Sequence, residues 1–277
     1  MTMINLNVRP LVLIMGLFLI GACSPNINEP SRSINLIIPT ENVKPLWFPS
    51  QGLSLQIQFS GEPDLEIEAD VFDLDAFDTD PSLIQQLHQY GKHAICYINA
   101  GAIEDWRPDV SSFPPEVVGK PYQGWPGENW LDIRNLEALA PILEARLDLC
   151  KSKGFDGVEY DNMDGFQNDT GFKLTDSDQL AFNRWLAEAA HERGLAAGLK
   201  NDPDQIVDIE PWFDFLILES CYAQGWCDLA QPFVEAGKPV FAIEYSNINK
   251  YCAIANNNSI TLLQKKLELD AWRKTCP

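Results

Sequence analysis

The chain has 277 residues, a formal net charge of −20 at pH 7, and 45% hydrophobic and 10% aromatic residues. This hydrophobic content can build a large core, which excludes an intrinsically disordered protein. The acidic balance makes nucleic acid a poor partner and would attract a cationic ligand, although acidity taken alone is more typical of plain solubility.

The first 22 residues predict an export signal. Arg9 supplies a positive charge, and the apolar run Leu11–Ile20 is too short to span a bilayer comfortably. Ile20-Gly21-Ala22-Cys23 resembles a bacterial lipobox, so we predict lipidation of Cys23. The alternative is a plain signal peptide with an incidental cysteine.

The chain therefore divides into three predicted parts. Residues 1–22 form the lipoprotein signal, and 23–44, rich in Asn, Pro and Ser, form a flexible tether. Residues 45–277 form one folded domain. We expect an exported monomer that is anchored to the cell envelope, facing the periplasm or the surface, and touches the membrane through its lipid only.

Six cysteines follow Cys23, and an even number in an oxidising compartment predicts disulfides. Cys96 lies in a strand-like run and Cys150 on a helix face. One interpretation is that both are buried free thiols, and the sequence leaves their state open. No CxxC spacing occurs and the histidines are scattered, so no metal site is expected. The expected disulfides close a short loop and hold the C-terminal segment: Cys221–Cys227 and Cys252–Cys276.

Eight short apolar runs alternate with helical patterns beyond residue 45 and predict a single (β/α)8 barrel of the TIM type. An open doubly wound sheet is the runner-up, but no glycine-rich phosphate loop supports nucleotide binding. Helices are expected at Asn135–Lys153, from a Thr175 cap to Gly194, and at Ile260–Arg273. The expected strands are Leu55–Phe59, Val71–Asp75, Ala94–Asn99, Trp130–Ile133, Gly157–Asp161, Ala196–Lys200, Phe213–Glu219 and Val240–Glu244.

Acidic side chains stand at the carboxyl ends of these strands, where α/β barrels place their sites. Any one of them is more often a helix cap or turn residue, but six or seven strands end this way. Asp161 and Glu219 end strands two apart, roughly 10 Å in a sheet, so leaning side chains can reach the separation that glycoside cleavage requires. Glu219 follows an apolar run that favours a general acid, whereas the polar neighbours of Asp161 favour an anion.

Further polar and aromatic residues near the same strand ends are predicted to bind substrate. Aromatic rings there stack on sugars or attract an ammonium group, with core packing as the alternative. Lys200 is predicted to form an ion pair rather than to act as a Schiff-base lysine. Met163 occupies a position where an EF-hand loop requires a calcium ligand, so that motif is excluded. The predicted binding residues are Asp73, Asp75, Glu104, Trp106, Trp130, Asp132, Glu159, Asn162, Asp164, Lys200, Asn201, Tyr222, Glu244 and Tyr245.

Several stretches occur in a characteristic order: Ile95–Gly101, Glu104–Arg107, Trp125–Glu128, Trp130–Arg134, Gly154–Glu159, Asp161-Asn162, Thr170–Phe172, Gly198–Asn201 and Glu244-Tyr245. Together, over about 200 residues, they resemble glycoside hydrolase family 114, the endo-α-1,4-polygalactosaminidases. The resemblance implies a (β/α)8-type barrel that hydrolyses α-1,4-linked galactosamine polymers without a cofactor. It places the catalytic pair on Asp161 and Glu219. Tyr160 and Ser220, beside this pair, depart from the family pattern and bear on fine substrate preference.

We therefore predict that residues 45–277 are a catalytic domain that cuts within a cationic, galactosamine-rich polysaccharide. Asp161 would be the nucleophile and Glu219 the acid/base. Amine groups on the sugars would agree with the acidic charge of the chain. The alternatives are a non-catalytic carbohydrate-binding barrel lipoprotein and a glycosidase that acts on a neutral glycan.

Overall fold

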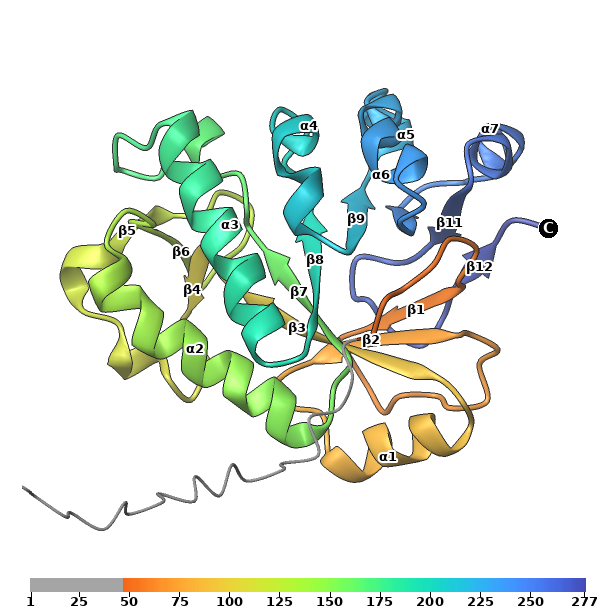
Figure 1. Ribbon diagram of the computed structural model, residues 1–277, viewed down its shortest axis with the longest axis horizontal. Coiled ribbons are helices and arrows are strands. Elements are labelled where there is room, and N and C mark those ends of the chain that lie inside the picture. Colours follow the sequence, from red (N-terminus) through yellow and green to blue (C-terminus); the bar gives the residue numbers. More distant parts are fainter. Residues whose placement is uncertain (1–46) are drawn as a thin grey trace, which may run out of the picture. The chain divides into compact units, whose positions relative to one another are not determined.

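The computed structural model describes residues 47–277. The predicted signal at 1–22, the lipidation site Cys23 and the tether at 23–44 lie outside the described residues. In the described part, a curved parallel sheet carries helices on its outer side (Figure 1). No helix in this part is long and apolar enough to cross a membrane.

The strands of the main sheet follow one another in chain order, and neighbours run parallel up to β11. A doubly wound sheet would reverse this order part-way, so the predicted TIM-type α/β barrel is confirmed. A short antiparallel strand, β12 (Lys274–Thr275), pairs with β11. The parallel strands are β1 (Leu55–Gln58), β2 (Val71–Asp75), β3 (His93–Asn99), β7 (Gly157–Asp161), β8 (Ala196–Lys200), β9 (Phe215–Glu219), β10 (Val240–Glu244) and β11 (Ile260–Gln264).

One predicted barrel strand and one predicted helix are wrong. The first two residues of the run Trp130–Ile133 belong to β6 in a separate antiparallel sheet, β4-β6-β5, inserted between β3 and α2. The eighth parallel strand is β11, within the segment predicted as the helix Ile260–Arg273. Its β-branched start, Ile260-Thr261, suits a strand, and β11 pairs with β10 along its whole length. The small sheet consists of β4 (Ala102–Glu104), β5 (Val118–Pro121) and β6 (Glu128–Leu131).

The two long helices begin as predicted. Asn135 caps α2, and Thr175 with Asp178 forms the capping box of α3. Gly154 follows α2 with φ +97°, a left-handed conformation that glycine adopts without strain. The helices are α1 (Pro81–Gln89), α2 (Leu136–Lys153), α3 (Asp176–Glu192), α4 (Ile206–Ile209), α5 (Cys221–Gln224), α6 (Gln231–Glu235) and α7 (Cys252–Asn257), with 3₁₀ turns at Val110–Ser112, Pro115–Val117, Gly165–Gln167, Glu210–Trp212 and Cys227–Ala230.

Alternate residues of the parallel strands point into the barrel and form its inner core. Gly198 faces inward on β8, where a Cβ atom would lie 2.1 Å from Cε2 of Phe215. The Phe215 ring therefore fills the space that a larger residue would need. We call this core the apolar floor: Leu55, Ile57, Val71, Ile95, Ala196, Phe215, Ile217, Phe241, Ile243 and Leu263.

Three disulfides join the described cysteines. The predicted pairs Cys221–Cys227 and Cys252–Cys276 are confirmed. The sequence left the state of Cys96 and Cys150 open, and the interpretation of both as free thiols is wrong, because they form a third disulfide. Both are fully buried, as expected, but the outer face of β3 packs on α2 and brings their Cα atoms within 5.9 Å.

The C-terminal segment lies along the seam between β11 and β1. The backbone amide of Phe59 donates to the Leu269 carbonyl at 3.0 Å. The Gln56 side chain reaches the Ala271 carbonyl at 3.2 Å, and Arg273 donates to the Leu55 carbonyl at 2.5 Å. This segment therefore takes the place of the helix expected after the last strand.

Candidate active site

A cavity of about 320 Å³ opens at the carboxyl end of the parallel strands. This is the edge where the sequence predicts a site, and the cavity brings together residues from β2, β3, β7, β8 and β9 and from the loops beyond. Ten of the predicted site residues line it: Asp75, Glu104, Trp106, Asp161, Asn162, Asp164, Lys200, Asn201, Glu219 and Tyr245.

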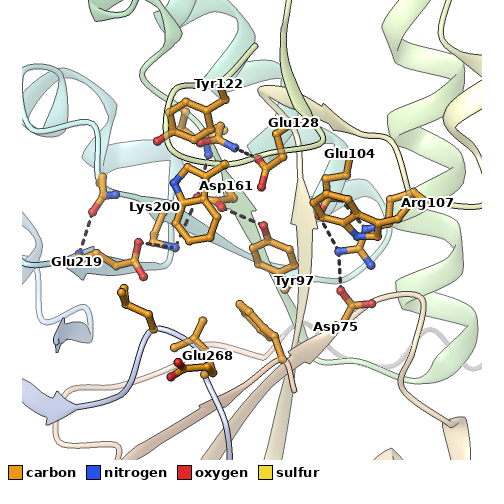
Figure 2. A pocket seen from close by; sticks show the side chains of 18 of the residues that line it. Asp75, Tyr97, Glu104, Arg107, Tyr122, Glu128, Asp161, Lys200, Glu219 and Glu268 are labelled. Carbon is orange, nitrogen blue, oxygen red and sulfur yellow. Dashed lines mark hydrogen bonds and ion pairs between the residues drawn. The ribbon is translucent and has the colours of Figure 1, made fainter. Parts of the chain in front are cut away.

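Asp161 and Glu219 lie on either side of Lys200 (Figure 2). The ammonium nitrogen of Lys200 is 3.5 Å from Asp161 Oδ1 and 3.5 Å from Glu219 Oε2. These two oxygens therefore cannot be more than about 7 Å apart, because twice the shared distance is the upper limit. That limit lies within the range of paired carboxylates in glycosidases.

Both carboxylates accept hydrogen bonds from tyrosine hydroxyls. Tyr97 donates to Asp161 Oδ2 at 2.9 Å, and Tyr245 donates to Glu219 Oε1. Burial, followed by the nearby negative charges, raises the pKa of each phenol. The two hydroxyls therefore stay protonated and act as fixed donors, while about a quarter of each carboxylate side chain remains exposed.

The residues that directly follow β7, β8 and β9 have left-handed backbones. The φ angles are +61° at Asn162, +51° at Asn201 and +56° at Ser220. Asn162 packs so tightly against the loop after β3 that a Cβ at Gly101 would lie 1.7 Å from its carbonyl oxygen. The Asn201 side chain in turn accepts from the amide of Glu219 at 2.9 Å. These turns hold the last residue of each strand at the cavity.

The model of Glycoside-hydrolase family GH114 matches residues 38–277. The chain belongs to glycoside hydrolase family 114. The crystal structure of Aspergillus fumigatus Ega3 in complex with galactosamine is similar to it at a TM-score of 0.80 and 35% identity, covering 84% of this chain and 98% of Ega3. The glycoside hydrolase domain of PelA from Pseudomonas aeruginosa shares the fold, at a TM-score of 0.65 and 15% identity, over 80% of this chain and 98% of that domain. A comparison with curated protein sequences gives no match.

In this family 114 enzyme, carboxylates outnumber cations around the cavity. Arg107 is neutralised by Asp75 and Glu104, each at 2.7 Å, and Lys200 is shared between acids. Glu268, after β11, faces the opening from the side away from Tyr122 (Figure 2). The lining therefore carries a surplus of negative charge. Its acids are Asp75, Asp78, Glu104, Glu128, Asp161, Asp164, Glu219 and Glu268.

Two of these acids bind their proton unusually tightly. Burial, reinforced by the charge of Asp161, raises the pKa of Glu128 to about 7 and that of Asp164 to about 6. Glu128 accepts from the side-chain amides of Asn99 at 3.0 Å and Asn162 at 3.5 Å. A cationic group in the cavity would favour the ionised form of both acids.

Aromatic rings form the rim of the cavity. The indoles of Trp106 and Trp125 are 55% and 50% exposed, which leaves apolar faces open to a ligand. Tyr122 lies between the rim and the buried Trp130, with ring centroids 4.5 Å apart. Exposed aromatic faces beside carboxylates suit sugar rings that carry amines.

Six predicted binding residues do not line the cavity. Asp132 pairs with Arg134 at 2.7 Å, away from the opening. Glu244 points to the outer side of β10 and accepts from the amide of Tyr222 at 2.8 Å, so it holds the start of α5. Asp73 and Glu159 are fully buried and lie beneath the cavity. The six are Asp73, Trp130, Asp132, Glu159, Tyr222 and Glu244.

Other lining residues were not predicted as site residues. Tyr97 alternates with Ile95 and Asn99 on β3, so strand periodicity could have placed it inside the barrel. Glu128 stands within one of the family-like stretches but carries no strand-end signal. The segment Leu267–Leu269 enters the cavity only because β11 is a strand. In residues 47–277, no three His, Cys, Asp or Glu side chains are grouped to hold a metal ion.

Proposed function

We propose that this enzyme cleaves within an α-1,4-linked, galactosamine-rich polysaccharide. The placement of Asp161 and Glu219 on either side of Lys200 carries the proposal, because two carboxyl groups at this spacing are the apparatus of glycoside hydrolysis. The Ega3 structure, 35% identical to this chain, holds galactosamine. The surplus of acids in the cavity supports a cationic substrate.

Asp161 is the proposed nucleophile and Glu219 the proposed acid/base. Glu219 donates its proton to the glycosidic oxygen while an oxygen of Asp161 bonds to the anomeric carbon and the sugar–oxygen bond breaks. Glu219 then takes a proton from water, whose oxygen replaces Asp161 on that carbon. An upper limit of about 7 Å between their oxygens favours this two-step, retaining route.

The surface around the catalytic pair supports cleavage inside a polysaccharide rather than at its end. The aromatic rim is open to solvent at Trp106 and Trp125, and Glu128 and Glu268 lie on opposite sides of the cavity (Figure 2). A linear polymer with protonated amines could therefore extend past the site in both directions. The net charge of −20 would also steer such a cationic polymer toward the enzyme.

We also propose that the enzyme is an exported lipoprotein. Three disulfides are typical of exported proteins. The lipobox-like residues before Cys23 support a lipid anchor, and the tether to residue 44 would hold a monomeric catalytic domain off the membrane.

A reducing-end assay on partially deacetylated α-1,4-galactosaminogalactan tests the function. Asp161→Asn and Glu219→Gln should each lower the rate by about 10³-fold, since each removes a group that transfers charge or a proton. Glu137→Gln on the exposed face of α2 is the matched control and should keep full activity.

Two results would favour the alternatives. Wild-type protein that binds the polymer but releases no reducing ends would be a carbohydrate-binding lipoprotein. Activity that does not fall as the polymer is N-acetylated would point to a neutral glycan as substrate.

A further inference from the structure

Two carboxyl groups lie beneath the cavity and have no step in this mechanism. Asp73 is the third residue of β2 and Glu159 the third of β7, so both point into the barrel like Asp161. Both are fully buried and do not line the cavity. A buried ionised carboxylate requires a cation or hydrogen-bond donors, so each must have a partner.

Lys200 is the partner of Glu159. Its ammonium nitrogen lies 2.9 Å from Glu159 Oε1, which is shorter than its 3.5 Å distances to Asp161 and Glu219. The shortest contact holds the ammonium on Glu159, midway between the two catalytic carboxylates. Lys200 is itself almost fully buried, so little water competes for these contacts.

Asp73 has no such cation. Among the described residues, neither oxygen of Asp73 has a hydrogen-bond donor, and Oε2 of Glu159 has none either. Glu159 is the charged neighbour that acts most strongly on Asp73. A hydrogen bond between two carboxyl groups requires a proton on one of them. Burial, followed by the charge of Glu159, raises the pKa of Asp73 well above its ordinary value. Burial also raises the pKa of Glu159, but Lys200 and the bond from Asp73 oppose this rise. The proton therefore resides on Asp73.

We propose that Asp73 is a neutral acid that donates a hydrogen bond to Glu159, and that the ionised Glu159 is the positioning residue that holds Lys200 between Asp161 and Glu219. The inference rests on the proposed function, because it assigns these roles relative to the catalytic pair. A single negative charge beneath Lys200 keeps its ammonium from neutralising either catalytic group. Asp161 then stays available as a nucleophile, and Glu219 can hold the proton that it donates.

The charge on Glu159 should shift the pKa of every titratable group around it. Its removal leaves Lys200 unbalanced, so the anionic forms of the catalytic pair become easier to form. The titratable groups that face this cluster from the surrounding strands are Asp73 on β2, Tyr97 on β3, Asp161 on β7, Lys200 on β8, Glu219 on β9 and Tyr245 after β10.

The pH profile of kcat on the deacetylated polymer separates the two buried acids. Asp73→Asn keeps the shape, the neutral charge and a donor for Glu159, so its profile should match that of the wild type. In the double variant Asp73→Asn/Glu159→Gln, both limbs should move to lower pH by about one unit or more. The maximal kcat should fall about 10-fold or more with little change in KM, because neither residue touches the cavity. The double variant is needed because Asp73 could ionise in place of Glu159 in Glu159→Gln alone.

Two outcomes would overturn the inference: a profile of Asp73→Asn that shifts as in the double variant, or a double variant that keeps the wild-type profile while Asp161→Asn and Glu219→Gln are inactive. Active Asp161→Asn and Glu219→Gln would instead remove the proposed function. Infrared spectroscopy at pH 7 tests the proton without substrate or the double variant. One component of the carbonyl band of protonated carboxylic acids should be present in wild-type protein and lost in Asp73→Asn, while the contribution of Glu128 remains in both. Identical spectra would show that Asp73 is ionised.

Discussion

The apolar floor and the mouth of the barrel are built on the same strands with opposite chemistry. On β9, Phe215 and Ile217 belong to the floor, and two residues further Glu219 reaches the cavity. On β7 the inward-facing residues become charged earlier along the strand, because Glu159 already lies inside the barrel beneath Asp161. One periodicity thus supplies a packed core at one end and a cluster of charge at the other.

This difference separates the residues that stabilise the fold, in the apolar floor, from those that form the site, at the mouth. Each fully buried side chain of the floor contributes roughly 1.5–3 kcal/mol through removal from water. At the mouth, burial acts in the opposite direction: it raises the pKa of Glu128 and Asp164 because the charged forms are disfavoured. The floor therefore supports a mouth that is costly to fold. Three substitutions test this division.

Lys200→Met should have the largest effect, because Lys200 is almost fully buried and also lines the cavity. It leaves Glu159 buried without its cation, which should cost about 3–5 kcal/mol of unfolding free energy. Activity should be lost as well, because the cation between the catalytic carboxylates is gone. Urea unfolding and the reducing-end assay measure the two losses. Lys120→Met, which breaks an exposed pair with Asp169, is the control and should cost about 0.5 kcal/mol or less.

Phe215→Ala should affect stability alone. Removal of a fully buried ring that packs on Gly198 should cost about 3–5 kcal/mol in urea unfolding. At a temperature where the variant is folded, kcat/KM should change by about threefold or less, since the ring does not reach the cavity. The exposed Phe48→Ala is the control. A loss of activity in the folded Phe215→Ala variant would break the separation of floor from mouth.

Glu128→Gln should stabilise the protein slightly, by an amount that grows as pH rises from about 4.5 to about 7. The folded-state pKa of about 7 exceeds the ordinary 4.5, so the stability contributed by Glu128 is fully present below about pH 4.5 and is lost as pH rises through 7. The uncharged variant lacks this loss. Its unfolding free energy relative to the wild type should therefore rise by about 1–2 kcal/mol between pH 5 and pH 8, after allowance for solvent screening. The same pH series on exposed Glu116→Gln is the control.

The sequence could predict which residues lie at the carboxyl end of each strand. Asp161 and Glu219 end buried strands. Because the carboxyl ends of parallel barrel strands meet at one edge, both were predictable as residues of one site. The caps at Asn135 and Thr175 were predictable for the same local reason. Strand parity would also have separated Glu244, on the outer face, from Tyr245, on the inner face.

What remained hidden depends on contacts between distant segments. The Cys96–Cys150 disulfide joins residues 54 positions apart, and only the packing of α2 on β3 selects that pair. Glu128 reaches the cavity because the small antiparallel sheet folds over the strand ends. The segment after Ile260 combines apolar and charged residues at spacings that a helix also satisfies, so periodicity misassigned it.

The seam between β11 and β1 has a consequence for the order of folding. β1 is made early, yet its partners across the seam, Ala271 and Arg273, follow more than two hundred positions later. Until they arrive, one edge of β1 has no neighbour, and Leu267–Leu269 is absent from the cavity wall. Closure of the barrel and completion of the substrate site are therefore a single late event. A growing chain would therefore complete its site only after residues 267–273 have been made.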